Sequence, residues 1–290
     1  MATSFDALTV PALTQELREH DYIADRGLAT SLLLALKLGK PLLLEGEVGV
    51  GKTELAKTLA AMTGRDLIRL QCYEGIDTNH AMYEWDYARQ MLHIRSLNQS
   101  DTAVIENELF GPEFLLERPL LQAVRAGDRC VLLIDEVDRA DDEFEAFLLE
   151  LLGDFQVTIP EVGTIRANSR PIVILTSNRT RELHDALKRR CLYTWIGFPD
   201  AAREVAIVRS RLPGIGETLA EQVVDAVNRL REMELEKLPG VAETIDWTAS
   251  LDALGATELT DDLALDTLGA VVKDRDDLEF AAGNIQDVVS

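Results

Sequence analysis

Residues 41–64 read PLLLEGEVGVGKTELAKTLAAMTG, and this stretch decides the fold. A short apolar run leads into a loop that fits the pattern GxxxxGK(S/T), and a segment with helical periodicity follows. In such a unit the glycines let backbone N–H groups converge on phosphate oxygens, and the helix N-terminus adds partial positive charge. A glycine turn that only starts a helix is the alternative. We expect these residues to bind nucleotide phosphates: Gly46, Glu47, Val48, Gly49, Val50, Gly51, Lys52, Thr53 and Glu54.

Four further apolar runs follow at intervals, and helical segments separate them. The runs are DLIRLQC, CVLLIDEV, PIVILTSN and YTWIGF, and the helical segments after the loop are KTELAKTLAAMTG, EFEAFLLELLGD and RELHDALKRR. Continuous apolar runs between helices are typical of parallel strands that are covered on both faces. We therefore predict a three-layer α/β domain over residues 41–198. Residues 156–167 alternate around Pro160 and Gly163, which predicts an inserted β-hairpin.

The flanking segments read as helices. Residues 1–40 form a helical lead-in that includes the very apolar SLLLALKLG, and residues 199–290 lack strand patterns. The last forty residues hold ten acidic and two basic side chains, which predicts a solvated acidic surface.

Composition excludes some classes of protein. The chain has 290 residues and 47 % apolar residues, and its 29 basic and 51 acidic side chains give a net charge of −22, which disfavours nucleic acid as a partner. The N-terminus lacks the features of a secretory signal, and no run of about 18 apolar residues occurs, so we expect a cytoplasmic protein without a transmembrane segment. The three cysteines, Cys72, Cys130 and Cys191, form no CxxC motif, and the spacing of His80 and His93 is not typical of metal ligands. The sequence therefore predicts neither a disulfide framework nor a zinc site.

Two strands end in polar side chains that suit phosphate chemistry. The strand CVLLIDE ends in adjacent carboxylates, and alternation points them in different directions. We expect Asp135, together with the Thr53 hydroxyl, to hold Mg²⁺, and Glu136 to polarise the attacking water. A plain exposed strand end is the alternative. Asn178 follows another strand, where it could hold the same water, contact the γ-phosphate or cap the next helix.

Residues 179–190 form a basic edge in this acidic chain, with five basic and two acidic side chains. Such an edge suits an interface with an acidic neighbour. Arg190 ends a predicted helix just before a strand, where it could reach the γ-phosphate of a neighbouring subunit. Alternatively, Arg189 and Arg190 only interact with the helix dipole.

Residues 73–92 are rich in aromatic side chains. Exposed aromatics could grip a client protein. We favour the interpretation that Tyr73, Trp85 and Tyr87 pack a helix onto the sheet.

Together these motifs resemble an AAA+ ATPase, and the resemblance spans nearly the whole chain. More narrowly, YIADRGLATSLLLALKLGKPLLLEGEVGVGKTELAKTLA, LIDEVDRADDEFEAFLLELLGDFQVTIPEVGTI and DALKRRCLYTWI are similar to the MoxR branch and, within it, to CoxD-type ATPases of carbon monoxide dehydrogenase maturation. The resemblance implies a P-loop fold with a five-stranded parallel sheet in an αβα core and a small helical lid. It also implies a hexameric ring that uses ATP and Mg²⁺, a partner with a von Willebrand factor A domain, and an oxidoreductase client.

The resemblance also assigns roles to residues. Residues 46–53 correspond to Walker A, Asp135 and Glu136 to Walker B, and Asn178 to sensor 1. Arg190 corresponds to the arginine finger, with Arg189 as second choice, and the hairpin lies near the central pore. One departure stands out, because no basic residue occurs between Gly240 and Leu251, where many relatives place a sensor 2 arginine. Sensor 2 is then absent, or Glu243 or Thr244 takes its place.

Other functions remain open at this point. The same motifs occur in nucleic-acid motors and loaders, which need a continuous basic surface to bind nucleic acid. A third class is a scaffold that binds nucleotide but hydrolyses it slowly. The absence of a lid arginine is compatible with this class, whereas Glu136 favours hydrolysis.

Overall fold

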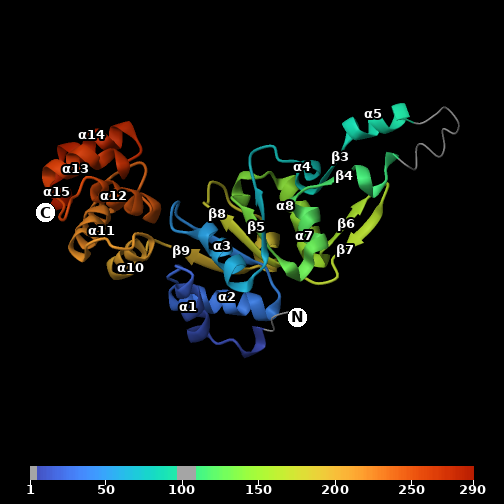
Figure 1. Ribbon diagram of the computed structural model, residues 1–290, viewed down its shortest axis with the longest axis horizontal. Coiled ribbons are helices and arrows are strands. Elements are labelled where there is room, and N and C mark those ends of the chain that lie inside the picture. Colours follow the sequence, from blue (N-terminus) through green and yellow to red (C-terminus); the bar gives the residue numbers. More distant parts are fainter. Residues whose placement is uncertain (1–4, 97–108) are drawn as a thin grey trace.

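The computed structural model describes residues 5–96 and 109–290, so residues 1–4 of the predicted lead-in lie outside the described residues. Its main sheet has five parallel strands, as predicted, and their order is β2-β5-β8-β1-β9 (Figure 1). The strands are β1 (Leu42–Gly46), β2 (Asp66–Gln71), β5 (Cys130–Asp135), β8 (Ile172–Ser177) and β9 (Leu192–Ile196).

Helices cover both faces of this sheet because successive strand residues point to opposite sides. Leu42 and Leu44 pack among apolar side chains of one helical layer, whereas Leu43 packs in a separate core on the other face. The first layer contains α1 (Val10–Glu19), α2 (Arg26–Leu38) and α3 (Lys52–Thr63). The second contains α7 (Pro119–Ala126), α8 (Asp142–Asp154) and α9 (Asp185–Arg190). The three-layer αβα core is therefore confirmed.

An arm projects from the second layer, on the side away from the C-terminal helices (Figure 1). It consists of α4 (Thr78–Met82), β3 (Tyr83–Trp85), α5 (Tyr87–Ser96), η2 (Pro112–Phe114) and β4 (Leu115–Glu117), and β3 pairs with β4. Trp85 is buried, with its ring centroid 5.1 Å from that of Phe110. The predicted packing is wrong for Tyr73 and Tyr87, which are 48 % and 64 % exposed. Tyr87 begins a helix that extends beyond the sheet, so no layer covers it.

The basic edge is less helical than predicted. Only Asp185–Arg190 of the segment RELHDALKRR is helical, as α9. Before it, Arg181 donates to the carbonyl of Ala140 and pairs with the buried Glu145, and these contacts keep the chain in a loop. Upstream, β6 (Gln156–Ile159) and β7 (Gly163–Arg166) form an antiparallel hairpin after α8.

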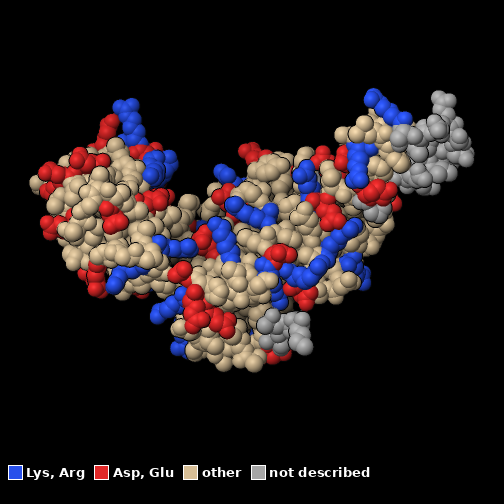
Figure 2. Space-filling model, in the orientation of Figure 1, with Lys and Arg blue, Asp and Glu red and all other residues tan. Residues whose placement is uncertain are grey.

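All elements after Asp200 are helical and enclose a core of their own. They are α10 (Ala201–Arg211), α11 (Glu217–Glu232), α12 (Val241–Ala253), α13 (Asp261–Thr267), α14 (Arg275–Gly283) and α15 (Ile285–Val289). The remaining short helices of the described chain are η1 (Phe5–Ala7), η3 (Gly127–Arg129), η4 (Val137–Arg139) and η5 (Leu268–Ala270). Acidic side chains gather over this C-terminal domain (Figure 2). Among the described helices, none has the length and apolarity that a membrane span requires.

A buried ion pair joins three of these helices. Arg231 of α11 donates to both carboxylate oxygens of Glu204 of α10, at 2.6 and 2.8 Å, and Thr244 of α12 donates to the same carboxylate. Glu204 is fully buried, and the Arg231 guanidinium also lies 4.3 Å from the ring of Phe198, which precedes the first helix. This network therefore also fixes the connection between the two domains.

We expect Arg231→Met to lower the free energy of unfolding by about 3–5 kcal/mol, because it leaves the Glu204 carboxylate buried without a counter-charge. Arg209→Met is the matched control, since Arg209 pairs with Glu217 on the surface and such exposed pairs contribute about 1 kcal/mol or less. Urea unfolding followed by circular dichroism measures both. Equal effects of the two substitutions would show that the buried pair has no special role.

Candidate functional site

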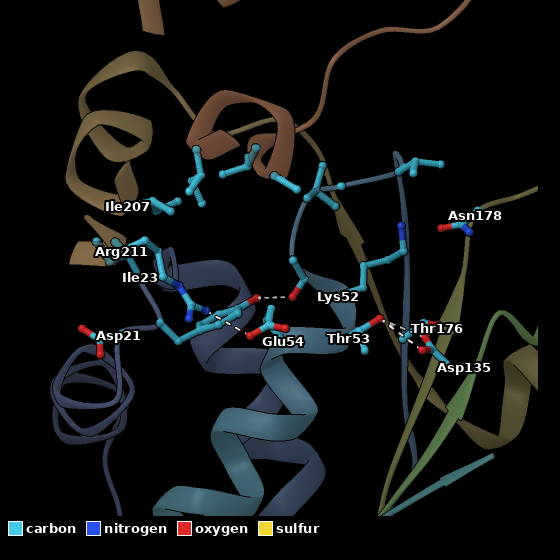
Figure 3. A pocket seen from close by; sticks show the side chains of 18 of the residues that line it. Asp21, Ile23, Lys52, Thr53, Glu54, Asp135, Thr176, Asn178, Ile207 and Arg211 are labelled. Atoms are coloured by element: carbon cyan, nitrogen blue, oxygen red, sulfur yellow. Dashed lines mark hydrogen bonds and ion pairs between the residues drawn. The ribbon is translucent and has the colours of Figure 1, made fainter. Parts of the chain in front are cut away.

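A pocket lies at the carboxyl ends of β1, β5 and β8, between the sheet and the C-terminal helices (Figure 3). The loop after β1, the ends of β5 and β8, and helices α10 and α12 all contribute to its lining. Segments that are far apart in the sequence thus meet at the carboxyl ends of the parallel strands.

The glycine loop forms the floor of this pocket. Gly51 has φ = 91°, a conformation that favours glycine, and α3 begins at the next residue. Lys52 is nearly buried and its Nζ donates to the carbonyls of Gly46 and Glu47, at 2.8 and 2.6 Å. Burial lowers the pKa of Lys52, and the carboxylate of Asp138 opposes this shift. Gly46 and Glu47 thus lie behind the lysine, whereas Val48, Gly49, Val50, Gly51, Lys52, Thr53 and Glu54 line the pocket.

Thr53 and Asp135 meet at the base of the pocket. The Thr53 hydroxyl donates to Oδ1 of Asp135 at 3.0 Å, and the Asp135 side chain is 2 % exposed. Thr176 of β8 and Arg69 of β2 also donate to this carboxylate. A hydroxyl and a carboxylate are hard oxygen donors of the kind that Mg²⁺ prefers, so the residues present fit this metal.

Glu136 lies beyond the strand, so the alternation expected from the sequence does not set its direction. It is the first residue after β5 and has φ = 55°, a left-handed backbone that is rare outside glycine. Its carboxylate accepts hydrogen bonds from Gln71 Nε2 at 3.0 Å, Arg139 at 3.2 Å and Asn178 Nδ2 at 3.4 Å. A carboxylate that lines this pocket and is oriented by three donors can accept a proton from a bound water.

Asn178 follows β8 and lines the same pocket. Its backbone N–H donates to Oδ1 of Asp138 at 3.2 Å. The alternative in which Asn178 caps the next helix is wrong, because that helix begins at Asp185 and its N-cap residue is His184.

Arg190 does not reach this pocket within one chain. It lies at the end of α9, and its guanidinium donates to the carbonyl of Leu149. Arg189 and Arg190 line a groove together with Lys40 and Pro41, which precede β1, whereas the phosphate loop follows β1. The glycine loop and the groove that holds Arg190 therefore lie at opposite ends of β1.

The backbone of the C-terminal domain contacts the backbone of the glycine loop. The N–H of Val241 donates to the Gly49 carbonyl at 3.1 Å, and a Cβ on Gly240 would lie 2.7 Å from the Gly49 Cα. Val241, Ala242 and Ile245 of α12 present an apolar face to the pocket. Glu243 caps the helix and Thr244 is buried against Glu204, so neither takes the place of a lid arginine. The interpretation in which Glu243 or Thr244 replaces a lid arginine is therefore wrong.

Several pocket residues were missed from the sequence. Arg203 and Arg211 of α10 line the pocket, where Arg211 pairs with Glu54 at 3.0 Å and Arg203 with Asp25 at 2.9 Å. No local pattern marks them, because their position depends on how the helical domain packs. Gln71 and Arg69 could have been found only with the strand order, which pairs β2 with β5.

Comparisons with known proteins agree with this geometry. The family model described as AAA domain (dynein-related subfamily) matches residues 41–191. The chain is 26 % identical over 269 residues to the gas vesicle ATPase GvpN1 of Halobacterium salinarum, covering 88 % of this chain and 75 % of that one. It is 31 % identical over 135 residues to the chaperone protein ClpB of Leptolyngbya boryana, covering 46 % and 13 %. A Thermotoga maritima RuvB mutant structure superposes with a TM-score of 0.50 at 17 % identity, covering 95 % and 74 %, which shows similarity of fold alone.

We expect Glu136→Gln to lower kcat for nucleotide hydrolysis at least about 100-fold, because the amide cannot accept a proton from water. Nucleotide binding should persist, since the glycine loop, Lys52 and Thr53 are unchanged. Glu143→Gln, at an exposed glutamate of α8, is the matched control and should leave both properties intact. Phosphate release and titration with a fluorescent ATP analogue measure the two effects, and a Glu136→Gln enzyme with normal turnover would contradict the assignment.

Proposed function

The chain belongs to the AAA domain family (dynein-related subfamily), and on this premise we propose that it works as a MoxR-type, chaperone-like ring machine that remodels a client protein. It is an ATPase, and its family uses ATP with Mg²⁺. The observation that carries the proposal is the joint placement of Lys52, Asp135 and Glu136 in one pocket that the helical domain closes.

The residue roles follow from their positions. Lys52 and the backbone of the glycine loop bind the phosphates, and Thr53 and Asp135 hold the metal. The metal, when bound, neutralises phosphate charge. Glu136 orients and polarises the attacking water, and Asn178, which donates to Glu136, helps to place it. Apolar contacts from α12 exclude water from the rest of the pocket.

A hexameric ring accounts for the position of Arg190. The pocket and the end of α9 lie at opposite ends of the parallel strands, so an Arg190 that acts on a nucleotide would act on the site of another subunit. An arginine supplied in trans stabilises the charge that develops on the transferred phosphoryl group. Arg189, on the same groove, is the second candidate.

The arm supplies a surface for clients or partners. On α5, which lies away from the main sheet (Figure 1), Tyr87, Met91 and Leu92 are 64, 54 and 66 % exposed. Such a surface on a projecting element is typical of protein contacts. From the sequence resemblance we infer a partner with a von Willebrand factor A domain and a client such as carbon monoxide dehydrogenase or another molybdenum hydroxylase, acting in the cytoplasm.

A nucleic-acid motor is a weaker candidate. Its basic surface would have to be the edge at residues 179–190, yet Arg181 pairs with Glu145, Arg179 with Glu45 and Lys188 with Glu182. These internal pairs cancel part of the charge that phosphate backbones need, in a chain of net charge −22. A scaffold with little turnover is disfavoured by the placement of Glu136.

We expect Arg190→Ala to be inactive alone and to regain turnover when it is mixed with Glu136→Gln. In mixed rings an intact pocket can lie beside an intact Arg190. Steady-state ATPase activity against protein concentration, with mass photometry on the same samples, measures turnover and assembly together. Arg170→Ala, which removes an exposed arginine from the same groove, is the control. Normal activity of Arg190→Ala at all concentrations would exclude a site shared in this way.

We expect a purified apo-form of a molybdenum hydroxylase, together with the von Willebrand factor A partner, to raise ATP turnover by the wild-type chain. Met91→Ser and Leu92→Ser should lose this stimulation and keep basal turnover, because the exposed face of α5 lies outside the pocket. Leu254→Ser is the control, since Leu254 is 63 % exposed on the helical domain. Equal loss in all three variants would remove the arm from client recognition.

A further inference from the structure

We propose that Arg69 occupies the metal-binding carboxylate of Asp135 when no nucleotide is bound and must leave it for the metal to bind, an inference that rests on the function proposed above. Arg69 lies on β2, next to β5 in the sheet. Its Nε and Nη2 donate to the same oxygen, Oδ2 of Asp135, at 3.0 and 2.6 Å. A charge-assisted contact of this kind is among the stronger hydrogen bonds of proteins.

The Asp135 carboxylate has no capacity left for a further partner. An ionised carboxylate offers about four lone-pair positions. Oδ1 accepts from Thr176 at 2.5 Å and from Thr53 at 3.0 Å, and the two guanidinium nitrogens take Oδ2. Coordination of a metal, directly or through water, therefore requires that one donor leaves.

Of the three donors, Arg69 is the one that can move. Thr176 is 1 % exposed inside β8, and Thr53 belongs to the first turn of α3 and is itself a metal ligand candidate. The Arg69 side chain is 47 % exposed, so its guanidinium can turn into solvent and stay hydrated, while the metal takes its place as the counter-charge of Asp135. Asp135, which is 2 % exposed, cannot follow it.

Arg69 also links the metal position to the water-polarising carboxylate. Its Nη2 donates to Oε1 of Gln71, and Nε2 of the same Gln71 donates to Glu136 at 3.0 Å. Departure of Arg69 removes one contact of the Gln71 amide, whose Nε2 also donates to the carbonyl of Cys72 at 3.4 Å. The amide then holds Glu136 less firmly, so the metal position and the general base are connected through two side chains of one strand.

The charge of Arg69 suppresses metal binding before nucleotide arrives. An unpaired buried carboxylate in a chain of net charge −22 would attract divalent cations by itself. With the guanidinium in place the Asp135 carboxylate has a counter-charge. Metal binding then depends on the phosphates, which add the negative charge and the oxygen ligands that outweigh Arg69.

Mn²⁺ is the probe for this test, and electron paramagnetic resonance of the nucleotide-free chain reports its binding. We expect Arg69→Met to bind one Mn²⁺ about tenfold more tightly than wild type, because it removes the cation in contact with Asp135. Arg139→Met is the matched control, since Arg139 pairs with Glu136 but does not contact Asp135. It should shift the affinity by less than twofold. The double variant Arg69→Met/Asp135→Asn should lose the gained site.

Two results would overturn the proposal. One is an unchanged Mn²⁺ affinity in Arg69→Met, and the other is a gain that persists in the double variant or equals that of Arg139→Met. If Arg69→Met does not fold by circular dichroism, Arg69→Gln, which keeps a polar side chain beside Gln71, replaces it with the same expectations. ATP turnover by the wild type is scored separately. An inactive wild type with a tighter Mn²⁺ site in Arg69→Met would overturn the proposed function and leave this inference standing.

Discussion

The buried carboxylate of Asp135 is the constraint on which the site depends. It ends a central strand where no water can reach it freely, so its charge must be satisfied by the protein. Three elements do so, because Thr53 comes from α3, Thr176 from β8 and Arg69 from β2. These donors connect β5 to α3 and to its two neighbouring strands, β2 and β8. A displacement of any one of these elements would remove a partner of the buried carboxylate, and this cost holds the elements together before nucleotide binds.

The helical domain is attached to this rigid part in a different way. Its own core is separate, and within it the Glu204–Arg231 pair joins three helices and reaches Phe198 in the connecting segment. Toward the nucleotide it offers apolar side chains of α12 and two arginines of α10. Ion pairs such as Arg211–Glu54 are partly exposed and weak. A rigid body that is joined by weak surface contacts can move as a unit when the pocket fills.

The sheet, the glycine loop and the acidic strand end could be predicted from the sequence, because each depends on residues that are close together in the chain. Apolar runs such as CVLLID identify buried strands, and the glycine pattern fixes where a helix must start. Arg69 and Gln71 could not be found, because their importance comes from β2 lying beside β5. Arg203 and Arg211 depend on the packing of a second domain. Tyr73 and Tyr87 were placed wrongly because aromatic composition does not reveal whether another layer covers a side chain. The roles of Asn178 and Arg190 stay predictions, as a single chain places them without testing them.

The contact between Gly49 and Gly240 has a mechanical consequence. Two backbones meet there with no side chain between them, and a main-chain hydrogen bond from Val241 joins them. Side-chain rotation cannot absorb any relative movement at this point. A tilt of the helical domain would therefore either break this hydrogen bond or displace the glycine loop. In the second case, opening of the pocket and displacement of the loop would be a single motion.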